Sequence, residues 1–141
     1  MNSGLTLSKL KDKGYKITVA RKKMVDILAG TKKPLSAKEI LAILKRKGLS
    51  VNKTTVYREL QFLIDEGFLK KIHLNPEETS YEPEELIHHH HLVCEVCGRI
   101  DSITDCLAEK FEDKVFKKKG FKIKKHNLEF YGACSRCIKK N

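Results

Sequence analysis

The sequence predicts an α+β fold in two parts, and three observations lead to this prediction. Apolar residues recur at helical spacing through the first half of the 141-residue chain. Two short segments of strand composition then flank a turn at residues 75–78. The last third carries two Cys-x-x-Cys pairs, and its apolar residues alternate as they do in strands. A boundary after Pro83 divides the chain into a first domain over residues 1–83 and a smaller α/β domain over residues 84–141. In the second domain the pattern predicts strands around residues 92–100, strands again over residues 121–131, and between them a helix over residues 107–119 whose inward residues are Leu107, Ala108, Phe111 and Val115.

Four helices are predicted in the first domain from their capping residues. Thr18 and Asn52 are typical N-caps, because their side chains accept hydrogen bonds from free backbone N–H groups. Ser36 and Glu39 have the spacing of a capping box. The predicted helices cover residues 5–13, residues 19–29, a segment from Ser36 to Gly48, and a segment that begins at Asn52. Helices followed by a β-hairpin predict a winged helix-turn-helix.

The fourth predicted helix has one apolar face and one polar face. The apolar face consists of Val56, Leu60, Leu63 and Ile64, which follow helical spacing. The opposite face carries Lys53, Thr54, Tyr57 and Arg58. Hydroxyls, an aromatic ring and a guanidinium suit the reading of bases in the DNA major groove. Exposed basic residues more often only solvate a helix face, so the pattern alone leaves both interpretations open.

The charge of the chain favours an anionic partner. The sequence holds 29 basic and 18 acidic side chains, a net charge of +11. Residues 1–83 hold 17 basic and 9 acidic side chains, a net of +8, and residues 84–141 hold 12 and 9, a net of +3. The first domain is therefore the expected binding surface for nucleic acid. Because no apolar run reaches about 20 residues and the start lacks a hydrophobic signal core, we expect a cytoplasmic protein without membrane contact.

Four of the five cysteines predict a structural zinc site. Cys94 and Cys97 form one Cys-x-x-Cys pair, and Cys134 and Cys137 form the other. Two such pairs can converge on one tetrahedral ion, which leaves no open position for water. An odd number of cysteines with this spacing favours thiolate–metal bonds over disulfides. Cys106 falls outside both pairs, and we interpret it as a small buried apolar residue.

A run of four histidines, residues 88–91, precedes the first cysteine pair. Side chains along an extended backbone alternate between two faces. His88 and His90 should therefore face one way, and His89 and His91 the other. The run can thus contribute to two metal sites.

The chain resembles the ferric uptake regulator family, which includes zinc-uptake and peroxide-stress regulators, over nearly its whole length. The motifs that carry the resemblance are Gly14 to Thr18 with Arg21, Thr55 to Arg58, Tyr81-Glu82, His88 to His91, Cys94/Cys97, Glu109, His126 and Cys134/Cys137. The resemblance implies a homodimeric, metal-dependent repressor of metal-uptake or homeostasis genes that binds a palindromic double-stranded operator. Its implied DNA contacts are Lys16, Arg21, Thr54, Thr55, Tyr57 and Arg58.

The resemblance also implies two metal sites beside the structural zinc. A regulatory site would use Glu82, His89 and His91 and would hold Zn²⁺ or Fe²⁺/Mn²⁺. A second site would use His88, His90, Glu109 and His126. This assignment agrees with the alternation of the histidine run.

Two departures from the family pattern bear on the metal. Lys33-Pro34 stands where many members have a histidine ligand, and His73 on the hairpin is the nearest substitute, although it can equally be a surface histidine. His90 stands where iron-type members commonly have aspartate, which favours zinc. We therefore expect zinc sensing, with iron-dependent regulation or peroxide sensing as the alternative.

Other classes of protein remain as more distant alternatives. A zinc hydrolase or deaminase would also combine cysteines, histidines and carboxylates. The deaminase pattern of His-x-Glu followed by Pro-Cys-x-x-Cys is absent, however, and the four-cysteine site has no place for a catalytic water. A metal buffer or chaperone would not need the polar face of the fourth helix. We therefore expect a regulator without a small-molecule substrate, and not an enzyme.

Overall fold

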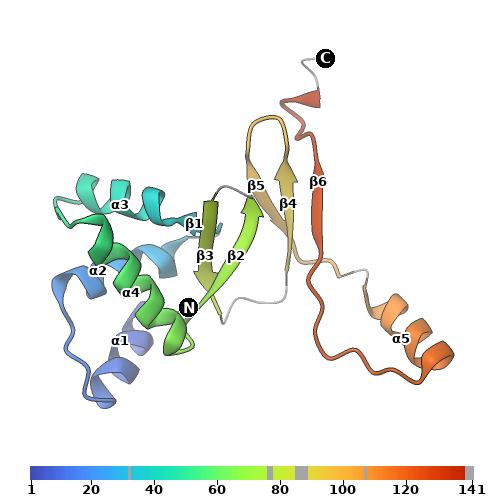
Figure 1. The fold of residues 1–141 in the computed structure, drawn as a ribbon, viewed down its shortest axis with the longest axis horizontal. Helices are drawn as coiled ribbons and strands as arrows, with labels where there is room; N and C mark the ends of the chain where they lie inside the picture. Colours follow the sequence, from blue (N-terminus) through green and yellow to red (C-terminus); the bar gives the residue numbers. More distant parts are fainter. Residues whose placement is uncertain (32, 76–77, 85–88, 107, 139–141) are drawn as a thin grey trace. The chain divides into compact units, whose positions relative to one another are not determined.

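The computed structural model describes residues 1–31, 33–75, 78–84, 89–106 and 108–138, with the backbone traced in Figure 1. The chain forms two compact units, Met1–Leu86 and Ile87–Asn141. The first unit contains four helices and a small sheet among its described residues, and the second contains a sheet and one helix. The predicted α+β fold is confirmed. None of the described helices is both long and apolar enough to cross a bilayer.

Three of the four helices of the first unit begin at the caps expected from the sequence, whereas the first begins at Ser3, two residues before the predicted start, with Asn2 as its N-cap. The Thr18 side chain accepts the backbone N–H of Arg21, and the Asn52 side chain accepts that of Thr55. Ser36 and Glu39 form the reciprocal capping box. The helices are α1 (Ser3–Asp12), α2 (Val19–Gly30), α3 (Ala37–Arg46) and α4 (Lys53–Asp65).

The wing of the first unit is a three-stranded antiparallel sheet in the order β1-β3-β2. The hairpin strands are β2 (Leu69–Asn75) and β3 (Glu78–Pro83), and the turn between them falls on residues 76–77, outside the described part of the chain. The third strand, β1 (Leu35–Ser36), pairs with β3 through Leu35 and Tyr81. The sequence did not predict β1, since two residues are too few for a periodic pattern.

One apolar core holds this unit together, and all four helices contribute to it. Val56, Leu60 and Leu63 on α4 are fully buried and pack with residues of α1, α2, α3 and the wing. The turn from α4 into β2 needs Gly67, whose φ of 74° is disfavoured for other residues. Its backbone N–H bonds the Ile64 carbonyl, which ends the helix in a left-handed cap.

The second unit is built on a mixed sheet in the order β5-β4-β6. Its strands are β4 (His90–Cys94), β5 (Ile100–Ile103) and β6 (Glu129–Gly132), and its helix is α5 (Ala108–Lys119). β5 pairs with β4 in the antiparallel sense, and β6 pairs with it in the parallel sense. The parallel pairing places Cys94, at the end of β4, opposite Gly132, two residues before Cys134.

Two features of the second unit differ from what the sequence predicts. A strand was expected over residues 121–131, but residues 121–128 have no regular secondary structure and only the end of this segment belongs to β6. Phe111 was expected to face inward from α5, and it is 62% exposed, with Phe116 nearby at 56%. Ala108 does lie inward. The helix thus buries little apolar surface within a single chain.

Candidate nucleic-acid interface and metal centres

The N-terminal turns of α4 present a polar surface to solvent. Lys53, Thr54, Tyr57 and Arg58 are exposed, and the Lys53 ammonium lies 5.6 Å from the centre of the Tyr57 ring. The Thr55 hydroxyl differs, because it donates to the Asn52 side chain at 2.8 Å and so strengthens the helix cap. Four side chains of this turn are therefore available to a partner, and Thr55 supports the backbone beneath them.

Arg21, expected among the DNA contacts, is held inside the first unit. Its guanidinium makes two hydrogen bonds to Glu59 of α4, at 2.8 and 3.2 Å, and lies 3.8 Å from the centre of the Phe62 ring. A third hydrogen bond of 2.8 Å goes to the backbone carbonyl of Lys16. With its donors engaged in this way, Arg21 positions the segment before α2 against α4, and the exposed Lys16 side chain is the group that this segment offers.

A second anchor ties the same segment to the end of α4. The Glu66 carboxylate accepts hydrogen bonds from the Lys13 ammonium at 2.7 Å and from the Tyr15 hydroxyl at 2.6 Å. The hydrogen bond from Lys13, followed by that from Tyr15, lowers the pKa of Glu66 below its ordinary value. The Tyr15 ring also packs edge-on against Phe62. Lys16 is thus fixed between two anchors on α4.

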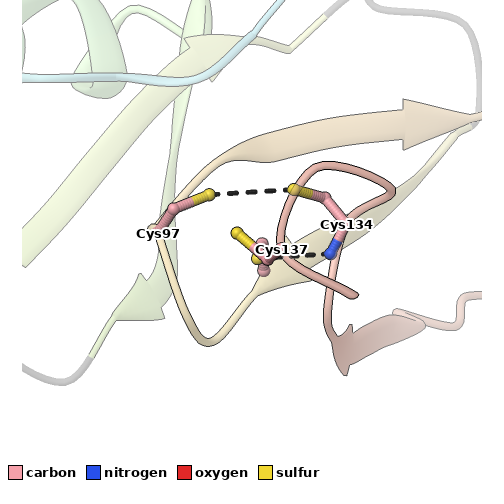
Figure 2. Close-up of side chains that lie close together, drawn as sticks. Cys97, Cys134 and Cys137 are labelled. Atoms are coloured by element: carbon pink, nitrogen blue, oxygen red, sulfur yellow. Dashed lines mark hydrogen bonds between the residues drawn. The ribbon is translucent and has the colours of Figure 1, made fainter. Parts of the chain in front are cut away.

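The four paired cysteines converge at one end of the second unit. The first pair lies in a tight turn after β4, which is closed by the Gly98 N–H bonding the Cys94 carbonyl. The second pair lies in a turn after β6. Figure 2 shows Cys97 and Cys134 facing each other with Cys137 alongside, and the Cys97 and Cys134 sulfurs are 3.8 Å apart. All four sulfurs lie within 4.8 Å of one another.

This sulfur cluster fits a tetrahedral zinc ion. Zn–S bonds of about 2.3 Å arranged tetrahedrally place sulfurs about 3.8 Å apart, which is the separation of Cys97 and Cys134. The Cys134 N–H donates to the Cys94 sulfur at 3.3 Å, and this hydrogen bond lowers the pKa of the Cys94 thiol to about 6. Hydrogen bonding to Cys97 instead raises the pKa of Cys137 to about 12. Zinc binding would require all four sulfurs to be ionised, and the shared cation would offset the repulsion between them.

The described histidines of the run, residues 89–91, have different neighbours. The His89 and His91 rings contact each other edge to face, with centroids 4.8 Å apart. His90 is buried and lies beside His126, at a centroid distance of 5.3 Å. Glu82 of the predicted regulatory set belongs to the first unit, where its carboxylate accepts from Lys70 at 3.1 Å. The predicted set thus contains residues of both units, and the regulatory site stays a prediction.

The predicted second site is only partly described. His90 and His126 lie together, whereas His88 and the side chain of Glu109 fall outside the described part of the chain. The structure instead brings Cys106 to this place, with its sulfur 3.2 Å from His126 Nε2. Cys106 is half-buried beside polar groups, so it does not occupy the apolar setting that we expected. No sequence pattern links it to His126, 20 residues away.

His73, the substitute ligand suggested by the sequence, lies exposed on β2. Its Nδ1 atom is 3.4 Å from the Thr79 hydroxyl, on the neighbouring strand. His73 belongs to none of the groups of metal-binding side chains found among the described residues. Its role as a ligand stays a prediction.

Comparisons with known proteins agree over most of the chain. A family model described as "Ferric uptake regulator family" matches residues 12–131. A "Ferric uptake regulation protein" of Bacillus subtilis is 36% identical over 132 residues, which cover 91% of this chain and 89% of that protein. One from Neisseria meningitidis is 33% identical over 132 residues, with coverages of 93% and 92%. The solved structure of a Helicobacter pylori ferric uptake regulator, titled as having three functional metal binding sites, matches with a TM-score of 0.85 at 27% identity, over 98% of this chain and 95% of that one.

The placement of Arg21 predicts a selective effect on stability. Arg21→Lys keeps the positive charge but loses the two-pronged contact with Glu59, so the free energy of unfolding of the first unit should fall by about 2 kcal/mol. Arg58→Lys, at an exposed position, is the matched control and should change it by less than about 0.5 kcal/mol. Denaturant unfolding at fixed zinc measures both variants. Equal stability of the two variants would remove the positioning role of Arg21.

Proposed function

The chain belongs to the ferric uptake regulator family, and from this premise we propose that it is a metal-responsive repressor that binds a palindromic DNA operator as a homodimer. It is a metal-dependent transcriptional regulator by family, and this sets aside the zinc hydrolase and the metal buffer. A regulator of this kind acts where the DNA is, so the proposal includes a cytoplasmic location. The genes it controls are metal-uptake or homeostasis genes.

The exposed turn of α4 is the observation that carries the DNA-binding part of this proposal. Thr54, Tyr57 and Arg58 project from a helix whose other face is locked into the core, so a rigid support presents them. The Tyr57 ring can contact thymine methyls, and the Thr54 hydroxyl can bond base edges. Arg58 and Lys16 supply positive charge for phosphates. Thr55 and Arg21 contribute by holding the surface in shape.

Dimerisation follows from the apolar surface that one copy of the second unit leaves exposed. Phe111 and Phe116 on α5 and Phe130 and Tyr131 on β6 are all large side chains in contact with solvent. An exposed apolar surface of this kind marks a protein interface. A second copy of the chain would cover it and would place two α4 helices on the two half-sites of a palindrome.

The proposed regulatory ligands are Glu82, His89 and His91. Glu82 lies in β3 of the DNA-binding unit, one residue before its end, and the two histidines lie at the start of β4 in the other unit, His89 just before it and His91 within it. An ion held by ligands from both units would favour one arrangement of the DNA-binding units over others. It does so only to the extent that it binds that arrangement more tightly.

We propose zinc as the sensed metal because the donors are rich in imidazole. Two histidines and one carboxylate suit zinc at four-coordination, whereas iron regulators usually use more oxygen ligands. The relatives named as ferric uptake regulation proteins favour Fe²⁺ as the alternative, and peroxide sensing would use bound iron with oxidisable histidines. The structural zinc belongs to the four cysteines in either case.

The two kinds of zinc should leave the protein at different chelator strengths. A mild chelator is expected to abolish operator binding while one zinc ion per chain stays with the four cysteines, because closed thiolate sites hold zinc more tightly. His89→Ala and His91→Ala should keep that zinc and lose the metal response. Operator binding and zinc content are measured together in one titration. Operator binding that lasts until the cysteine zinc is removed, or that ferrous iron restores and zinc does not, would overturn the choice of metal.

The DNA-contact residues should differ in what they affect. Tyr57→Ala should reduce the preference for operator over random DNA by about 10-fold or more, since a base contact contributes about 1–3 kcal/mol of discrimination. Lys16→Ala should weaken binding to all sequences and lower the salt dependence by about one counterion. Lys11→Ala, an exposed lysine of α1, is the control of equal charge. Equal salt slopes for Lys16→Ala and Lys11→Ala would remove Lys16 from the interface.

A further inference from the structure

We propose that Cys106 is a metal ligand in the second unit and joins His90 and His126 of the predicted second site in a thiolate-containing centre, with Glu112 orienting His126. The donor atoms of the three residues lie within 4.8 Å of one another. They come from three segments: His90 from β4, Cys106 from the loop before α5, and His126 from the irregular segment before β6. The centre differs from the predicted second site because a sulfur joins the two histidines.

The contact with Glu112 indicates which nitrogen of His126 would bind a metal. Glu112 Oε1 lies 2.6 Å from His126 Nδ1. Because a carboxylate accepts hydrogen bonds, this contact favours the neutral tautomer with the proton on Nδ1, in which Nε2 is the ligand atom. Nε2 lies 3.2 Å from the Cys106 sulfur. A carboxylate behind a histidine is the arrangement that orients metal-binding imidazoles and raises their basicity.

The spacing of the donors matches a four-coordinate ion. Bonds of about 2.3 Å to sulfur and 2.0–2.1 Å to nitrogen, arranged tetrahedrally, separate the two ligand atoms by about 3.5 Å. The observed 3.2 Å requires an opening of only a few tenths of an ångström. His90 is 2% exposed, and its ring is tilted by 32° from the His126 ring at a centroid distance of 5.3 Å. Three protein ligands leave a fourth position for water or another donor.

The types of donor atom indicate which class of metal ion this centre would bind. A thiolate with two imidazoles selects Zn²⁺ and similar borderline or soft ions such as Co²⁺ and Cu⁺, and it disfavours Mg²⁺ and Mn²⁺, which prefer oxygen. Cys106 therefore makes this centre more selective for zinc than histidine and carboxylate ligands alone would. This inference concerns the second unit only, and it holds whether or not the protein represses through Glu82, His89 and His91.

Cobalt(II) is the probe that tests the Cys106 ligand directly, because a cobalt–thiolate bond adds a charge-transfer band in the near ultraviolet. Protein with one zinc ion already bound by the four cysteines is titrated with Co²⁺ alone, without DNA. The wild type should gain the band when enough Co²⁺ is added to fill both this centre and the site of Glu82, His89 and His91, and Cys106→Ser, which keeps the four-cysteine site, should lose that gain. Any exchange of cobalt into the four cysteines is common to both proteins and cancels in their difference.

Variants of α5 test the orienting role of Glu112. Glu112→Gln should weaken cobalt binding by about 10- to 100-fold. Asp113→Asn, one residue along the same helix and exposed, is the matched control and should leave it unchanged. As a measurement on the unaltered protein, Zn²⁺ in excess of all the proposed sites should slow alkylation of Cys106, read by peptide mass spectrometry.

A cobalt band of equal size in the wild type and in Cys106→Ser would overturn the proposal, as would alkylation of Cys106 that added zinc does not slow. Both results would leave the contact between Cys106 and His126 as a hydrogen bond only. Neither readout uses operator DNA, so failure of this proposal and failure of the proposed regulatory function are distinguishable.

Discussion

The second unit depends on four sulfur atoms held close enough to share one cation. Among the described residues of the chain, the buried apolar core lies almost wholly in the first unit, and the second contributes only Cys94 and Ala108. So small a core cannot offset the conformational entropy of ordering a sheet and a helix. Zinc binding contributes about 10 kcal/mol or more to folding in sites of this kind. The ion would join the turn after β4 to the turn after β6. The metal thus takes the place of the apolar core.

The first unit is stabilised instead by an apolar core and by polar side chains that bond to α4. The buried face of α4 is packed on all sides, and its exposed face can therefore serve recognition without loss of stability. The segment before α2 is bound to this helix at two places, by Arg21 at Glu59 in the middle of α4 and by Lys13 at Glu66 at its C-terminal end. The position of Lys16 is consequently set by the same helix that carries Tyr57. Both the packing of the first unit and its proposed DNA contacts therefore depend on α4.

Local patterns in the sequence were sufficient for the helices, three of their caps, the hairpin of the wing and the two cysteine pairs. These features depend on neighbouring residues or on a fixed spacing. The pairing of Arg21 with Glu59 spans 38 positions, and the approach of Cys106 to His126 joins two irregular segments. No periodicity relates such positions, so only the folded chain reveals them. The exposure of Phe111 has another cause, since a pattern predicts which side chains are apolar but not which copy of the chain covers them.

Amide hydrogen exchange with and without zinc at the four cysteines tests most directly whether this ion holds the second unit together. After complete removal of zinc by a strong chelator, peptides from β4, β5 and β6 should lose their protection against exchange. Peptides from α2 and α4 should keep theirs, because an apolar core stabilises them. Unchanged protection of β4–β6 in protein shown to contain no zinc would contradict this account.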